Sequence, residues 1–117
     1  MTGYIKLYRK FIKWEWYSDV NVSRLFLHLL FKANYEDKRW QGTEIKAGQL
    51  ITSLDHLSKE TGLSKQQVRT AIQKLKNTGE INTRATRQYS IITINNWYAY
   101  QDDNTRATHE QHTSNTN

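Results

Sequence analysis

The chain has 117 residues, enough for one domain with a modest core, and its 17 lysine and arginine residues outnumber 11 aspartate and glutamate residues, giving a net charge of +6. It contains no cysteine, which excludes a disulfide framework and a cysteine-ligated zinc site. No apolar run approaches the length of a membrane span, and no signal-peptide core follows the basic N-terminus, so we expect a soluble cytoplasmic protein without membrane partners.

An aromatic-rich segment opens the chain. We predict a short strand over Gly3–Leu7 and a helix over Tyr8–Tyr17. Aromatic side chains bury a large area each, so core packing is the first expectation for this segment. A self-association surface is the alternative, because DNA-binding dimers contact repeated half-sites. The candidate self-association residues are Tyr8, Phe11, Trp14, Trp16 and Tyr17.

The most apolar helix of the chain is predicted next. Ser23 is the expected N-cap of Arg24–Asn34, which has nearly continuous apolar coverage. Tyr35–Gly42 is predicted to be a charged loop. Glu44–Thr52 then suggests a short strand, with a turn at Gly48, that pairs with strands near the end of the domain.

A helix-turn-helix is predicted over residues 54–79. Ser53 caps a short helix, Leu54–Thr61, which Gly62 ends. Ser64 begins a second helix that continues to Lys76 and stops before Gly79. Ser64 and the glutamine three residues later match a Ser-x-x-Gln capping box. Two helices joined by a short angled turn are typical of DNA-binding proteins, although other helical hairpins imitate the pattern.

The second of these helices carries the candidate DNA-reading face. Its apolar residues recur at the i, i+3, i+4, i+7 spacing of a buried face, and the opposite face carries amides, a hydroxyl and a guanidinium suited to base edges in the major groove. Flanking lysines suit phosphates. An ordinary solvated helix is the alternative. The residues assigned to DNA binding here are Ser64, Lys65, Gln66, Gln67, Arg69, Thr70, Gln73 and Lys74.

A hairpin with a basic tip is predicted after this helix. Glu80–Ile81 and Tyr89–Ile94 form its strands, and the polar segment Asn82–Gln88 joins them. From residue 64 to residue 90 six basic residues accompany a single acid, which is typical of a DNA footprint. Solubility is the alternative role of the tip arginines. The residues assigned to DNA binding in this wing are Arg84, Thr86, Arg87 and Gln88.

The end of the chain divides into two parts. Asn95–Tyr100 is predicted to fold back on the domain through its aromatic residues. Residues 102–117 are polar, and we predict a disordered tail or the start of a linker there. The folded domain is therefore expected over residues 1–101. The predicted class is α+β, mainly helical: a winged helix-turn-helix with a small antiparallel β-sheet and an N-terminal aromatic-rich extension.

Several blocks of the chain resemble the N-terminal domain of DnaD-like replication proteins, the replisome organisers of phages and mobile elements in low-GC Gram-positive bacteria. The matching blocks, in order, are Tyr4–Lys10, Trp14–Asp19, Leu25–Leu30, Lys46–Ser53, Leu63–Ala71 and Ile91–Trp97. The resemblance implies a winged helix that binds double-stranded DNA at a replication origin and self-associates as a dimer or higher homo-oligomer. It also implies a bacterial host cytoplasm and contact with a helicase or helicase loader through a region outside this chain.

Two other binding functions remain open, and an enzyme is the weakest option. A winged-helix transcriptional repressor has the same fold, and a single palindrome at a promoter would distinguish it from clustered repeats at an origin. A protein-interaction scaffold of a primosome would show weak DNA affinity that is insensitive to Arg69. The sequence contains no phosphate-binding loop, no HExxH motif and no paired nucleophile and base, so we expect neither an enzyme nor a cofactor or metal site.

Overall fold

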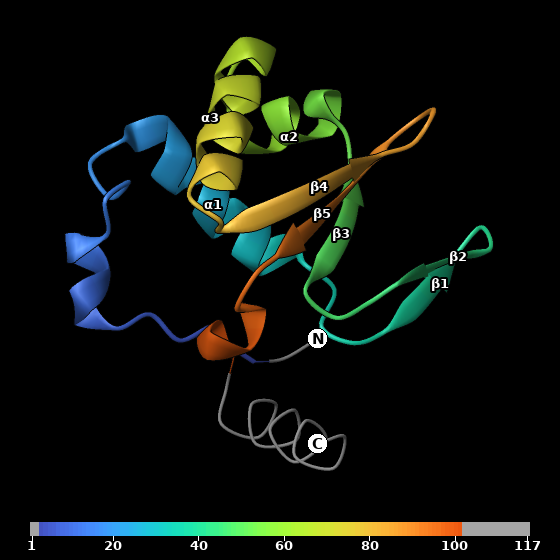
Figure 1. The fold of residues 1–117 in the computed structure, drawn as a ribbon, viewed down its shortest axis with the longest axis horizontal. Helices are drawn as coiled ribbons and strands as arrows, with labels where there is room; N and C mark the ends of the chain where they lie inside the picture. The colour runs from blue at the N-terminus through green and yellow to red at the C-terminus, as the bar shows by residue number, and fades with distance from the viewer. Residues whose placement is uncertain (1–2, 102–117) are drawn as a thin grey trace.

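Three α-helices, two antiparallel sheets and two short 3₁₀ helices make up the described part of the chain, residues 3–101 of a computed structural model. The structure is an α+β domain (Figure 1). Its elements in chain order are η1 (Arg9–Lys13), α1 (Val20–Lys32), β1 (Lys38–Trp40), β2 (Thr43–Ile45), β3 (Gln49–Thr52), α2 (Leu54–Thr61), α3 (Lys65–Asn77), β4 (Ile81–Ala85), β5 (Ser90–Ile94) and η2 (Trp97–Tyr100). The tail predicted over residues 102–117 lies outside the described residues.

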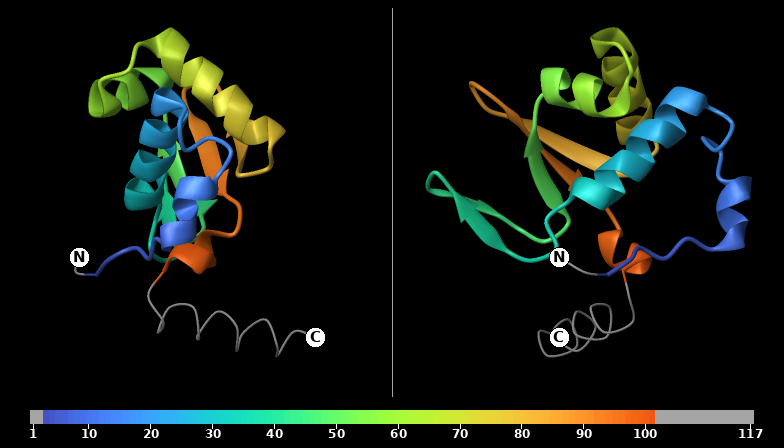
Figure 2. Two further views of the ribbon diagram at one scale, coloured as in Figure 1. Left: turned by 90° about the vertical axis from the view of Figure 1, so that its left-hand side faces the viewer. Right: turned by 180° about the vertical axis from the view of Figure 1, so that it is seen from behind.

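The larger sheet has the strand order β3-β5-β4, with β5 antiparallel to both neighbours. Leu50 of β3 and Thr83 of β4 both pair with Ile92 of β5. The predicted pairing of the strand before the helix-turn-helix with the later hairpin is therefore confirmed. β1 and β2 form a separate two-stranded hairpin. Both hairpins project from the side of the domain opposite η1 (Figures 1 and 2).

One hydrophobic core joins the three helices to the larger sheet. Apolar residues at helical spacing on α1 and α3 meet isoleucines of β4 and β5, and burial of these side chains is the main source of stability. The side chains of this cluster that are exposed by 1% or less are Val22, Leu25, Phe26, Leu29, Leu57, Val68, Ala71, Leu75, Ile81 and Ile92. The same packing turns the polar residues of α3 outward. Among the described residues, no helix combines the length and the apolar character needed to cross a bilayer.

The ends of α2 and α3 follow from local chemistry, as predicted. The Ser53 side chain accepts a hydrogen bond from the His56 amide, and Gly62 ends α2 with φ of +82°. The capping box at the start of α3 is confirmed. At its other end Gly79 adopts φ of +82°, and its amide and that of Glu80 bond back to the last turn, which is the pattern of a Schellman motif.

Four predictions in the first half of the chain are wrong. Gly3–Leu7 is not a strand, and the helix predicted over Tyr8–Tyr17 is limited to the short 3₁₀ helix η1. Helix α1 begins four residues earlier than predicted, at Val20, because the Asp19 carboxylate, rather than Ser23, accepts the hydrogen bond from the Val22 amide at 3.1 Å.

The fourth error concerns the charged loop predicted over residues 35–42, which instead contains β1 and the turn of the β1–β2 hairpin. Gln41 and Gly42 have φ of +48° and +80°, the two positive values that a two-residue type I′ turn requires. All three residues of β1 are exposed, so the strand has no apolar alternation that would reveal it in the sequence.

Candidate nucleic-acid interface

The outer face of α3 carries a row of exposed polar side chains. Val68, Ala71 and Leu75 are fully buried on the inner face, and the helical repeat of about 100° per residue therefore directs the other side outward. The four residues that the sequence assigns to base reading, Gln66, Arg69, Thr70 and Gln73, are all exposed there.

Hydrogen bonds between side chains one turn apart restrict the conformations of the residues on this outer face. Arg69 Nη1 donates to Gln66 Oε1 at 3.0 Å, and Gln66 Nε2 donates to Thr70 Oγ1 at 3.2 Å. One turn further, Gln73 Nε2 donates to Asn77 Oδ1 at 3.0 Å. Such i, i+3 and i, i+4 contacts restrict long side chains before any ligand arrives. The guanidinium of Arg69 keeps most of its five donors available, in a planar fork that suits two acceptors side by side.

Two of the predicted DNA-binding residues form the capping box of α3. Ser64 Oγ accepts from the Gln67 amide at 3.1 Å, and Gln67 Oε1 accepts from the Ser64 amide at 2.9 Å. These reciprocal bonds satisfy two backbone donors that a helix end leaves free. Both residues are exposed at the start of α3, and a DNA contact of either one stays a prediction.

The two lysines of the predicted set form ion pairs within the chain. Lys65 Nζ lies 2.5 Å from Asp55 Oδ1 on α2, and this lysine lowers the pKa of the Asp55 carboxyl. Lys74 Nζ lies 2.8 Å from Asp19 Oδ2 and 5.6 Å from the centre of the Trp16 ring. The hydrogen bond from Lys74 lowers the pKa of Asp19. Lys74 therefore ties α3 to the start of α1.

The β4–β5 hairpin holds the predicted wing residues on a strand and at its tip. Arg84 is exposed on β4, and Arg87 and Gln88 are exposed at the tip. Thr86 closes the turn, since its amide and hydroxyl both donate to the Tyr89 carbonyl, at 2.8 and 3.0 Å. In the described residues Arg84 and Arg87 form no ion pair, so their charges face solvent.

A groove of about 210 Å³ lies between α3 and the paired strands of this hairpin. Arg69 and Gln73 line it from α3, and Thr83 and Ser90 line it from β4 and β5. The structure thus brings the two predicted DNA-binding segments to one continuous surface. Lys76, Arg84 and Arg87 are exposed on α3 and the hairpin and form no ion pair among residues 3–101, so their positive charges favour an anionic partner.

Three of the five candidate self-association residues pack within the chain. Phe11 stacks on Trp14 with 5.1 Å between ring centres, and Trp14 lies 4.9 Å from the Phe26 ring in the core. Trp14 Nε1 donates to Glu80 Oε1 at 2.9 Å, and Trp16 Nε1 donates to Thr78 Oγ1 at the same distance. The N-terminal segment therefore packs against the C-terminal end of α3 and is hydrogen-bonded to it.

Tyr8 and Tyr17, the other two self-association candidates, keep 54% and 46% of their surface exposed. Self-association through these two residues stays a prediction. The sequence did not predict the partners that position α3 and the segment around it, which are Asp19, Asp55 and Glu80. Asp19 does carry a local signal, because aspartate is a preferred N-cap residue and this one caps α1. Asp55 and Glu80 carry none, because each binds a group on another segment of the chain.

The described residues include no group of three or more histidine and acidic side chains that could hold a metal ion. His28, which lies among apolar residues of α1, has its Nε2 2.8 Å from Glu60 Oε1, and this contact lowers the pKa of Glu60. No protein-family model matched the chain, and neither the curated proteins nor the solved structures that were searched gave a match.

Proposed function

We propose that this protein binds double-stranded DNA sequence-specifically as a winged helix, with α3 in the major groove and the β4–β5 hairpin as the wing. The observation that carries the proposal is the hydrogen-bonded polar face of Gln66, Arg69, Thr70 and Gln73 on α3. Two of these residues, Arg69 and Gln73, line a groove together with the β4–β5 hairpin. The element order helix, strand, helix, helix, strand, strand along α1, β3, α2, α3, β4 and β5 is that expected of the fold.

The chemistry of the face assigns a role to each group. Arginine presents two donors to the O6 and N7 acceptors of guanine, and glutamine presents one donor and one acceptor to adenine. Arg69 and Gln73 therefore read base edges, while Gln66 holds Arg69 and Thr70 in position. Lys76, Arg84 and Arg87 contact phosphates, which gives affinity without sequence preference.

The biological setting rests on the resemblance to DnaD-like proteins. We propose that the DNA site lies at a replication origin and that the protein acts in a replisome organiser, as a homo-oligomer whose larger assembly meets a helicase or helicase loader. A transcriptional repressor uses the same contacts on DNA. The bound sequence separates the two functions, because an origin offers clustered repeats and a promoter operator offers one palindrome.

Selection from a random duplex pool at ~0.15 M salt, followed by sequencing of the bound fraction, tests the proposal. We expect enrichment of a short motif. Arg69→Ala should weaken binding to that motif by about 1–3 kcal/mol and relax selection at one base pair. Arg9→Ala, which removes the same charge from the exposed η1, is the matched control and should keep the motif.

Two results would overturn the proposal. The first is a wild-type protein that enriches no motif, which would leave a non-specific or protein-binding role. The second is an Arg69→Ala variant with the same affinity and the same motif as the wild type, which would remove α3 from base reading. A primosome scaffold, the remaining alternative, predicts the first result together with a weak DNA affinity that Arg69→Ala leaves unchanged.

A further inference from the structure

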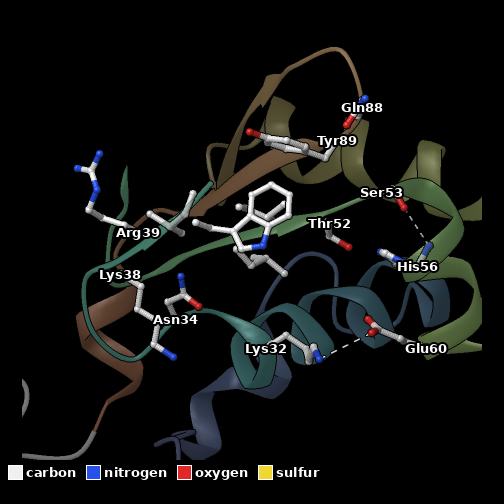
Figure 3. Close-up of a pocket in the computed structure, with 14 residues that line it drawn as sticks. Lys32, Asn34, Lys38, Arg39, Thr52, Ser53, His56, Glu60, Gln88 and Tyr89 are labelled. Atoms are coloured by element: carbon white, nitrogen blue, oxygen red, sulfur yellow. Dashed lines mark hydrogen bonds and ion pairs between the residues drawn. The ribbon is translucent and has the colours of Figure 1, made fainter. Parts of the chain in front are cut away.

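A second groove lies between the β1–β2 hairpin, the tip of the β4–β5 hairpin, β3, α2 and the end of α1 (Figure 3). Its volume is about 620 Å³, within the usual range of about 300–1,000 Å³ for ligand sites. Trp40 and Tyr89 contribute aromatic rings to it, and their ring centres are 5.2 Å apart with the planes nearly perpendicular. Trp40 keeps 41% of its surface exposed.

Both hairpins hold this aromatic pair. Trp40 belongs to β1, and Tyr89 precedes β5 at the tip of the β4–β5 hairpin. The Tyr89 hydroxyl lies 3.5 Å from Thr43 Oγ1 on β2, and its amide donates to Thr86 Oγ1 at 3.3 Å. The two rings are thus fixed relative to each other, so they lose less conformational entropy when a flat ligand stacks on them.

The walls of the groove are basic. Lys38 and Arg39 line it from β1 and Lys32 from the end of α1, and Figure 3 shows Lys32 and Lys38 across the groove from Tyr89. Arg39 donates one hydrogen bond, to the Gly42 carbonyl at 3.1 Å, and keeps its other donors. The one acidic residue of the lining, Glu60, is already engaged by His28 and Lys32.

We propose that this groove binds single-stranded DNA, with an unpaired base stacked on Trp40 and the flanking phosphates held by Lys38 and Arg39. Basic grooves lined by aromatic rings are the usual means of binding single strands, because every base offers a flat face. In a duplex the base faces are covered by their neighbours, so only an unpaired base reaches a recessed ring. An acidic peptide meets the same charges but brings no ring for Trp40.

The proposal goes beyond duplex binding and does not rest on it. The groove is lined by the β1–β2 hairpin and, at the tip of the β4–β5 hairpin, by Gln88 and Tyr89, whereas the proposed duplex contacts come from α3 and from Arg84 and Arg87. A protein with both surfaces holds a duplex and an adjoining melted strand at once.

The test measures fluorescence anisotropy of a labelled oligothymidylate of ~12 nucleotides, a length within the range that single-strand binding sites cover. Trp40→Ala should weaken binding at least about fivefold, the lower end for loss of a base–aromatic stack. Trp40→Phe keeps a ring and should retain most of the affinity. Lys38→Ala should make the salt dependence shallower by about 0.7 in log–log slope, the value for one phosphate of a single strand. Lys59→Ala, an exposed lysine outside the groove, should change neither quantity.

A duplex of equal length separates this site from the duplex face. Arg69→Ala should leave oligothymidylate binding unchanged, and Trp40→Ala should leave duplex binding unchanged. Three results would overturn the proposal: no binding of the oligothymidylate by the wild type, equal losses for duplex and single strand in Trp40→Ala, or affinities in Trp40→Ala and Lys38→Ala that match Lys59→Ala. Thermal unfolding followed by circular dichroism checks each variant, and if Trp40→Ala fails to fold, the slope of Lys38→Ala decides.

Discussion

Replacing Asp19 by alanine removes two interactions at the junction of α1 and α3. One carboxylate oxygen caps α1 through the Val22 amide at 3.1 Å, and the other lies 2.8 Å from Lys74 Nζ. Loss of an N-cap costs about 0.5–2 kcal/mol, and a partly exposed ion pair contributes about 0.2–1 kcal/mol. We expect Asp19→Ala to lower the free energy of unfolding by about 1–3 kcal/mol in urea denaturation followed by tryptophan fluorescence.

A second variant separates the two interactions. Asp19→Asn keeps an oxygen that can cap the helix and loses only the charge, so its cost should be about 0.2–1 kcal/mol at neutral pH. The pKa of Asp19 is lowered by its hydrogen bond from Lys74, so the ionised form stabilises the folded state. This contribution is present above the ordinary carboxyl pKa and is lost as the pH falls through the lower folded-state pKa.

The stability gap between the wild type and Asp19→Asn should therefore close as the pH falls below that folded-state pKa. A gap that persists in strong acid, or an Asp19→Ala variant as stable as the wild type at neutral pH, would refute the reasoning. The result also bears on function. If Lys74 is engaged by Asp19, Lys74→Ala should cost stability by a similar ion-pair amount while leaving DNA affinity unchanged.

Two further predictions concern the packing around the proposed interface. Gly48→Ala should destabilise the protein more than Gly62→Ala, although their φ values are +85° and +82°, because a Cβ at position 48 would lie 3.1 Å from a buried tryptophan side chain and one at position 62 would meet open space. Overpacking of this kind costs about 1–3 kcal/mol, and equal thermal unfolding midpoints would contradict it. Glu80→Ala removes the acceptor of the Trp14 indole and should speed tryptic cleavage after Lys13, whereas Glu80→Gln keeps an oxygen acceptor. Identical cleavage rates in all three proteins would show that the Trp14–Glu80 hydrogen bond is not needed to hold the N-terminal segment in place.

The helix-turn-helix is the part of the fold that the sequence predicts best, because its signals are local. Ser53 and Ser64 cap the helices, Gly62 and Gly79 end them with positive φ, and the apolar spacing sets the buried face of α3. The same periodicity correctly placed the exposed residues of the outer face. Each of these features depends on residues within about one or two turns, so no tertiary information is needed.

The features that the sequence did not predict depend on distant contacts. The N-terminal segment takes its path from Trp14 and Trp16, whose indoles bond to groups more than 60 positions away. The β1–β2 hairpin turns at Gln41, a residue type that seldom adopts positive φ. Its first strand, β1, is exposed throughout. The ion pairs of Lys65 and Lys74 likewise depend on how α3 packs against its neighbours. Helical spacing alone predicted that both lysines contact DNA phosphates.

These ion pairs set the salt dependence that the proposed duplex binding should show. If the phosphate contacts come from Lys76, Arg84 and Arg87, which form no ion pair in residues 3–101, the log–log slope of duplex affinity against salt should be about −2.7, at about −0.9 for each phosphate. If Lys65 and Lys74 also leave their carboxylates for phosphates, the slope should approach about −4.5. Both side chains of the Lys65–Asp55 pair are exposed, so the pair contributes little to stability. Lys65 is therefore the lysine whose transfer from its carboxylate to a phosphate most needs a test. We expect the shallower slope, because a lysine that leaves its carboxylate for a phosphate gives up one ion pair to gain another. A slope near the steeper value that Lys65→Ala reduces would show that the paired lysines contact DNA phosphates.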